Sequence, residues 1–172
     1  AIDYAMDIEK RFEHGELYSA DSIHFADSLK YYTLRQHRVV YGGGGIMPDV
    51  FVPLDTTQYT KFLRQMAARS YIINANLKYI DVNRKQLKKQ FATFNDFNAR
   101  FEVPQSLIDD VVQAAEKDKI KPKDQQELQA TLPQLRRQLK ALIARDLWDM
   151  SEYFQVINET NPIVVKAVRL LK

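Results

Sequence analysis

The chain has 172 residues, of which 45% are hydrophobic, 11% aromatic and 27% charged. This composition is typical of a globular chain and excludes an intrinsically disordered or collagen-like protein. Cysteine is absent, which excludes disulfides, thiolate catalysis and cysteine-based zinc sites. The sequence opens at Ala1 without a signal-peptide pattern or a long apolar run, so we expect a mature chain or an excised piece of a longer one, with no membrane span.

The net charge of +3 is too small to indicate a nucleic-acid partner by itself, but the charge is unevenly placed. Residues 61–100 carry nine bases against two acids, a net of +7, whereas residues 1–30 carry seven acids against three bases. We interpret this as pairing of opposite charges on a folded surface, because the aromatic residues follow helical spacing rather than an exposed platform. A polyanion-binding surface on residues 61–100 is the alternative, and no nucleic-acid partner is predicted.

The first predicted element is a short helix over residues 3–14. Tyr4, Ile8 and Phe12 recur at a spacing of four, which is typical of one helix face. Gly15 stands where a left-handed C-cap is expected. The polar residues 19–27 are predicted to form a connection.

A small β element is predicted next. Residues 30–34 and 38–41 are rich in Tyr, Thr and Val and are expected to pair as a hairpin through Arg35-Gln36-His37. After the glycine run Gly42–Gly45, the segment Val50–Val52 predicts a third strand. Proline at both ends, Pro48 and Pro53, indicates that this strand is brief or lies at a sheet edge.

From Thr56 onward the apolar spacing changes from two residues to about 3.6, which predicts helices. Thr56 or Thr57 is expected to cap the first helix, a second begins near Ser70, Pro104 opens another, and Pro133 begins or kinks the longest. The predicted apolar faces are Tyr59, Phe62, Leu63 and Met66; Ile72, Ile73, Leu77, Ile80 and Leu87; Phe91, Phe94, Phe97 and Phe101; Leu107, Ile108, Val111 and Val112; Leu132, Leu135, Leu139, Leu142, Ile143 and Leu147, continued by Trp148, Met150, Tyr153, Phe154 and Ile157; and a last helix over Ile163–Leu171.

The predicted fold is therefore mainly α. A short β-hairpin and strand element at about residues 30–53 precedes an α-helical bundle. Two domains are expected: residues 1–55, with the helix, linker, hairpin, glycine-rich turn and strand, and residues 56–172, which form a C-terminal helical domain.

The glycine run is the most unusual feature, since Gly42–Gly45 are four of the five glycines in the chain. A phosphate-binding loop must open onto a helix N-terminus, and a Walker loop also needs a following Lys and hydroxyl. Here Ile46-Met47-Pro48-Asp49 and a predicted strand follow. We therefore interpret the run as a turn, bulge or close backbone approach, and we expect no cofactor.

Other candidate groupings are weak. The histidines are spaced by ten and thirteen residues, which matches no compact metal-ligand pattern, so no metal site is predicted. Neighbouring Ser, His and Asp residues do not make a triad without the fold that assembles them. We expect no catalytic residue in this chain; the candidates considered are His14, His24 and His37; Asp21, Ser22 and Asp27; Ser28 and Lys30; Asp109 and Asp110; and Asp146 and Asp149, whose carboxylates look like helix-surface acids.

Residues 31–55 resemble the segment just downstream of the active site in carboxyl-terminal processing proteases, also called tail-specific proteases. In that family a hairpin with Tyr-x-Thr and Gly-Arg precedes a glycine-rich turn and the signature Gly-Ile-x-Pro-Asp. Gly45, Ile46, Pro48 and Asp49 match this signature, whereas His37 stands where the family usually has glycine. Residues 139–158 resemble the C-terminal helical extension of Bacteroidetes-type members.

The resemblance implies a serine-type endopeptidase, a hydrolase that cleaves near protein C-termini with a serine nucleophile and a lysine base. In that family those motifs and a PDZ domain precede the segment seen here, and this chain contains none of them. The resemblance therefore implies the C-terminal region of such a protease, inactive alone, in the periplasm or cell envelope.

Within such a parent, Gly42–Gly45, Ile46, Pro48 and Asp49 would have structural roles. The implied partners are the rest of the protease core, protein or peptide substrates through the parent, and a second copy if the helical domain self-associates. The alternative is a stand-alone helical module for protein interaction or oligomerisation.

Overall fold

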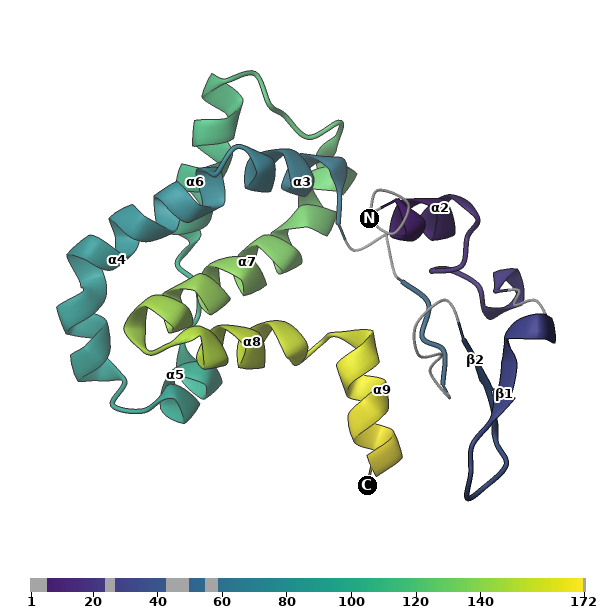
Figure 1. Cartoon of the computed structure of the whole chain (residues 1–172). Helices are drawn as coiled ribbons and strands as arrows, with labels where there is room; N and C mark the ends of the chain where they lie inside the picture. Colours follow the sequence, from purple (N-terminus) through teal and green to yellow (C-terminus); the bar gives the residue numbers. More distant parts are fainter. Residues whose placement is uncertain (1–5, 24–26, 43–49, 55–58, 172) are drawn as a thin grey trace. The chain divides into compact units, whose positions relative to one another are not determined.

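A computed structural model describes residues 6–23, 27–42, 50–54 and 59–171 (Figure 1). The chain divides into two compact units, Ala1–Asp55 and Thr56–Lys172. The described part is mainly helical, and a two-stranded antiparallel sheet precedes the helices of the second unit, so the predicted fold class is confirmed. No described helix is both long enough and apolar enough to cross a membrane.

In the first unit, helix α2 (Asp7–Glu13) ends at the expected glycine. Gly15 has a φ of +79°. Its N–H donates to the Phe12 carbonyl oxygen (3.1 Å), and the Glu16 N–H donates to the Arg11 carbonyl oxygen (3.0 Å). These two bonds form a Schellman motif, which satisfies carbonyl groups that the helix end leaves without partners. Two 3₁₀ turns follow, η1 (Ala20–Ser22) and η2 (Asp27–Leu29).

The predicted hairpin consists of β1 (Lys30–Tyr32) and β2 (Val39–Tyr41), with Tyr31 opposite Val40. The Thr33 side chain closes the loop, because its Oγ1 accepts a hydrogen bond from the Arg38 N–H (3.0 Å). His37 has a φ of +49°, in the left-handed region that histidine enters more readily than most residues. The loop thus turns without glycine.

The predicted third strand is wrong, because Val50–Val52 has no strand structure in the described residues. A strand needs a neighbour to take its backbone hydrogen bonds, and Pro53 has no N–H to give. The backbone of the next residue forms a hydrogen bond that belongs to no sheet, because the Leu54 N–H donates to the Leu17 carbonyl oxygen (2.9 Å).

The second unit is a helical bundle centred on its longest helix. That helix, α7, packs against α3, α4, α6 and α8, and Figure 1 shows it running through the middle of this unit. The helices are α3 (Lys61–Ala68), α4 (Tyr71–Gln90), α5 (Phe94–Arg100), α6 (Gln105–Lys117), α7 (Gln125–Leu147), α8 (Met150–Asn158) and α9 (Pro162–Leu171).

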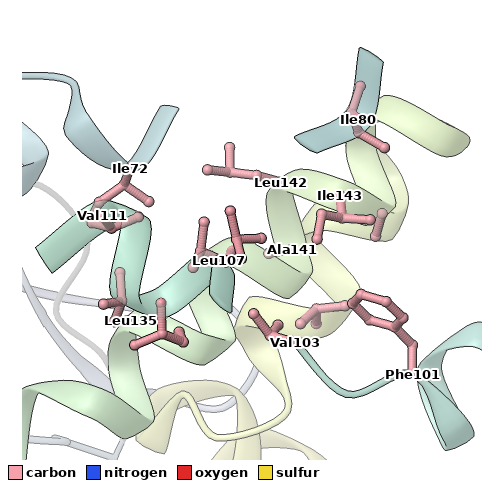
Figure 2. Close-up of a cluster of buried hydrophobic side chains, with 14 of the residues drawn as sticks. Ile72, Ile80, Phe101, Val103, Leu107, Val111, Leu135, Ala141, Leu142 and Ile143 are labelled. Atoms are coloured by element: carbon pink, nitrogen blue, oxygen red, sulfur yellow. The ribbon is translucent and has the colours of Figure 1, made fainter. Parts of the chain in front are cut away.

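The core forms where the apolar faces of α4, α6 and α7 meet (Figure 2). Leu135, Leu139 and Ile143 are completely buried and recur at a spacing of four along α7, as the sequence predicted. Ala141 and Ala144 are also completely buried, and their small side chains let neighbouring helices approach α7 closely. Ile73 and Leu77, which were expected on the apolar face of α4, remain 43% and 45% exposed.

Three expected helix boundaries need correction. The cap of α3 is Thr60, whose Oγ1 accepts from the Leu63 N–H (3.2 Å); Thr56 and Thr57 lie outside the described residues. Pro133 lies inside α7, which excludes the option that it begins the helix. The longest helix also does not continue through Trp148, because the backbone there (φ −123°, ψ −94°) leaves the helical region and Asp149 caps a separate α8.

The aromatic cluster around α5 is confirmed as core packing. Phe97 is completely buried, stacks on Phe101 at a centroid distance of 4.6 Å and meets Phe91 edge to face at 5.5 Å. Trp148 lies at the break between α7 and α8, and its ring centroid is 5.3 Å from that of Phe97. The corner after α7 therefore packs on α5.

Replacing Phe97 by alanine is expected to lower the free energy of unfolding by about 3–5 kcal/mol, because a large buried ring is lost and a cavity remains. The measurement is urea unfolding followed by circular dichroism. Phe154→Ala is the matched control: its ring is 52% exposed, so a loss of about 0.5 kcal/mol is expected. Equal losses for the two variants would contradict the assignment of the core.

Candidate functional site

Among the predicted signature residues, Gly42 is described, whereas Gly43, Gly44, Gly45, Ile46, Pro48 and Asp49 lie outside the described residues. The Gly42 N–H donates to the Leu29 carbonyl oxygen (2.8 Å). A Cβ atom at this position would lie 3.0 Å from Cε2 of Tyr31, which is closer than side chains normally pack. Gly42 therefore allows the Tyr31 ring to lie over the backbone where β2 ends.

The weaker sequence candidates do not assemble into a site. His14 follows α2, His37 lies in the hairpin loop, and His24 lies outside the described residues. A serine and lysine two residues apart would share one face of a strand, but Ser28 belongs to η2 and Lys30 to β1, so this pair does not form. In the described ranges, no three His, Cys, Asp or Glu side chains come together as metal ligands.

The first polar cluster that the structure does assemble joins the starts of α3 and α7. Glu127 accepts from two backbone N–H groups, those of Phe62 (3.0 Å) and Lys123 (2.6 Å). Its own N–H donates to Oδ1 of Asp124, the N-cap of α7 (2.8 Å). One carboxylate thus satisfies backbone donors at the beginning of one helix and just before another.

Two threonines complete this cluster. Thr131 is completely buried and its hydroxyl donates to the Glu127 carbonyl oxygen (2.7 Å). A hydroxyl has one proton to donate, so the Thr60 hydroxyl is the donor in the 2.6 Å contact between the two Oγ1 atoms. Both hydroxyls are therefore used to fix helix positions.

The second polar cluster lies between α4 and the end of α7. Asn76 is completely buried, and its Nδ2 donates to Oδ2 of Asp146 (2.6 Å). Oδ1 of the same carboxylate pairs with Arg145 (2.9 Å), and the Arg84 guanidinium donates to the Asp146 carbonyl oxygen. Asn76 Oδ1 is buried without a hydrogen-bond partner.

The interpretation as a surface acid is therefore wrong for Asp146, whereas Asp149 is exposed as expected. The Asp146 side chain is only 14% exposed and holds Asn76, whereas Asp149 accepts from the Met150 N–H (2.6 Å) and caps α8. Two signals in the sequence point to the two polar clusters. Asn76 stands four residues from both Ile72 and Ile80 on the buried stripe of α4, and Asp124 with Glu127 has the spacing of a capping box.

Among the groups whose pKa is shifted in this unit are the Glu127 carboxyl and the Lys140 ammonium. The hydrogen bonds from the Lys123 and Phe62 backbone N–H groups hold the pKa of Glu127 below its usual value. Burial lowers the pKa of Lys140, although the charges of Glu159 and Glu102 oppose this. The Lys140 ammonium donates to the Asn98 carbonyl oxygen (2.7 Å).

The helical unit has three notable surface hollows. One of about 570 Å³ lies between α4 and α6, and one of about 320 Å³ lies between α6 and α7. The third, of about 580 Å³, is bounded by α7, the end of α8 and the extended segment 101–103. The third is the only one of these whose lining combines three bases with buried apolar side chains.

A model of the family described as "Family of unknown function (DUF8443)" matches residues 62–149, which is more than half of the 172 residues. The chain belongs to this family. The DUF8443 region begins at the first buried residue of α3 and ends at the N-cap of α8, so it contains the second polar cluster and all of the first except Thr60. No curated protein and no solved structure matches the chain.

The polar side chains of the two clusters serve the architecture of the helical unit. Thr60, Thr131 and Glu127 hold helix N-termini, and Asn76 and Asp146 join α4 to α7. Among the described residues, the Ser151 hydroxyl donates to the Glu152 carboxylate (2.6 Å), but this contact is exposed and joins neighbouring residues at the start of α8. The contacts of the two clusters stabilise the helical scaffold. The third hollow offers charged groups to a ligand.

Replacing Asp146 by alanine is expected to lower the free energy of unfolding by about 1–3 kcal/mol, because the buried Asn76 amide loses its acceptor. Chemical denaturation checks this value. Asp81→Ala removes an exposed carboxylate from α4 and is expected to cost about 0.5 kcal/mol or less. A loss at Asp146 no larger than that at Asp81 would show that the cluster is not structural.

The Glu127 contacts predict a pH-dependent stability. The folded pKa lies below the unfolded value of about 4.3, so the stabilisation is complete above that value and is lost as the pH falls through the folded pKa. Glu127→Gln is expected to destabilise by about 1 kcal/mol at pH 7, and the difference from wild type should shrink at pH 3. Urea unfolding at both pH values tests this, with Glu116→Gln as control; a difference independent of pH would contradict it.

Proposed function

We propose that this chain is the C-terminal, non-catalytic region of a serine-type endopeptidase of the carboxyl-terminal processing family. Its hairpin completes the sheet of a larger protease core, and its helical unit braces that core or mediates self-association. The parent hydrolyses peptide bonds near protein C-termini in the periplasm or cell envelope. The observation that carries this proposal is a hairpin that is apolar on both faces and exposed on both.

The register of the hairpin defines its two faces. Tyr31 and Val40 are opposite each other on one face, and Tyr32 and Val39 on the other. These four side chains are 43% to 59% exposed. Strands that are apolar on both faces are typical of sheets covered on both sides, and a lone two-stranded hairpin is at best marginally stable in water. A larger sheet is the environment in which this sequence gains stability.

The residues that carry the resemblance also have hairpin-forming roles. Thr33 of the Tyr-x-Thr motif accepts the Arg38 N–H through its side chain, and the Tyr31 ring lies over Gly42. His37 takes the positive φ for which the protease family usually has glycine. The departure at His37 is therefore compatible with the same hairpin.

The helical unit supports a bracing role because it has its own core and uses its polar clusters for structure. A second candidate, a stand-alone interaction or oligomerisation module, is favoured by α9. That helix has no buried residue, and Ile163, Leu170 and Leu171 are 55%, 57% and 88% exposed. A ten-residue helix is marginal without packing partners.

The sequence encoded before Ala1 distinguishes the two candidates. The protease proposal expects a peptidase core with a serine nucleophile and a lysine base there. In the joined protein, deleting residues 57–172 is expected to change the oligomeric state or lower the melting temperature, measured by sedimentation and calorimetry. The isolated chain is expected to give no serine-dependent turnover of casein.

Three results would contradict the protease proposal. One is an upstream sequence without a Ser/Lys peptidase core. Another is a joined protein whose sedimentation and melting are unchanged by the deletion. The third is cleavage by the isolated chain that a serine-directed inhibitor blocks.

A further inference from the structure

The hollow of about 580 Å³ has a cationic wall built by one face of α7. Arg136, Arg137 and Lys140 share this face because they are three and four residues apart. Its floor is lined by Phe101, Val103 and Val156, which are nearly buried at 7%, 7% and 1% exposure, so a small apolar area faces the hollow. Hollows of roughly 300–1,000 Å³ with an apolar lining and a few fixed polar groups are typical of small-molecule sites.

The three cations of this wall are held in place by neutral acceptors. Arg136 donates to the Val103 carbonyl oxygen (3.3 Å) and to Gln105, and Arg137 donates to Oε1 of Gln134 (2.9 Å). Lys140 donates to the Asn98 carbonyl oxygen (2.7 Å). No described carboxylate forms an ion pair with any of them; ion pairs elsewhere in this unit are Arg100–Asp96 and Arg145–Asp146.

Charges of both signs line the hollow. Glu102 and Glu159 also line it, so three cations face two carboxylates and the net charge is +1. Both carboxylates act on Lys140, where their charges oppose the effect of burial on its pKa. The guanidinium groups of Arg136 and Arg137 each retain N–H donors beyond the hydrogen bonds given above, because a guanidinium has five. Arg136 and Arg137 therefore have N–H donors left for an anionic ligand.

We propose that this hollow binds a small monocarboxylate with a short aliphatic body. The carboxylate accepts from Arg136 and Arg137, whose planar donors suit its geometry, and the aliphatic body lies on Phe101, Val103 and Val156. The net charge of +1 matches one negative charge, and the two glutamates disfavour a dianion. This site is independent of the protease proposal, because it lies entirely within the helical unit.

The test uses the full 172-residue chain and hexanoate as the probe, followed by amide chemical shifts. Hexanoate is expected to shift the amides of Phe101–Val103 and to bind with a dissociation constant on the order of 1 mM. Hexan-1-ol tests the need for the charge, and inorganic phosphate tests the need for the apolar body. Both are expected to bind at least about tenfold more weakly.

Matched variants locate the binding. Arg137→Gln and Lys140→Met are expected to weaken hexanoate binding, by about tenfold for the arginine. Arg64→Gln and Lys88→Met remove the same charges from exposed positions of α3 and α4 and are expected to leave it unchanged. Circular dichroism melting shows that each variant is folded; Arg136 is kept because it ties α7 to Val103.

Four results would each overturn the proposal. The first is no shift at Phe101–Val103 at hexanoate concentrations up to about 20-fold above the expected dissociation constant, on the order of 20 mM. The others are binding of hexan-1-ol as tight as that of hexanoate, binding of phosphate as tight as that of hexanoate, and equal weakening of hexanoate binding by Arg64→Gln and Arg137→Gln. Shifts confined to the hollow that are weakened by Arg137→Gln and Lys140→Met, but not by Arg64→Gln or Lys88→Met, would support it.

Discussion

The helical unit depends on the burial of one face of α7. Leu135, Leu139 and Ile143 are completely buried along this helix, which packs against α3, α4, α6 and α8. Burial of such aliphatic side chains contributes about 1.5–3 kcal/mol each before entropy is counted. The two polar clusters lie at the ends of the same helix, Glu127 in its first turn and Asp146 in its last. Each ties a neighbouring helix to α7, so apolar burial and polar contacts specify one arrangement.

The hairpin differs, because its four central apolar side chains stay 43% to 59% exposed among the described residues. Its apolar side chains are arranged for burial on two faces, yet Tyr32 remains 59% exposed and Val39 44% exposed. Its order comes from local features: the Thr33 side chain that closes the loop, the positive φ of His37 and the close approach of Tyr31 to Gly42. Local contacts define its shape but add little stability. The contrast between a self-sufficient helical unit and a dependent hairpin is the physical basis for proposing a larger protease core as its partner.

Much of the helical unit was predictable because its apolar residues repeat at helical spacing, which identified α4, α6 and the buried stripe of α7. The Gly15 cap was also predictable, since glycine is favoured at that position. The break at Trp148 was not, because apolar residues continue at helical spacing through α8 and only the Asp149 cap marks the new helix. Val50–Val52 has strand-forming residues, but pairing needs a neighbour that composition does not reveal. The hollow beside α7 joins residues 101–103 to 133–140, and this tertiary juxtaposition left no local pattern.

The central claim is that the helical unit is stable by itself and the hairpin is not. Native-state hydrogen exchange of the whole chain tests it directly, because backbone amides report local opening free energies. The amides of Leu139 and Ile143 are expected to exchange only through global unfolding. The amides of Thr33 and Gly42, although hydrogen-bonded, should exchange close to the rate of an unprotected peptide. Equal protection of these hairpin amides and those of α7 would contradict the account.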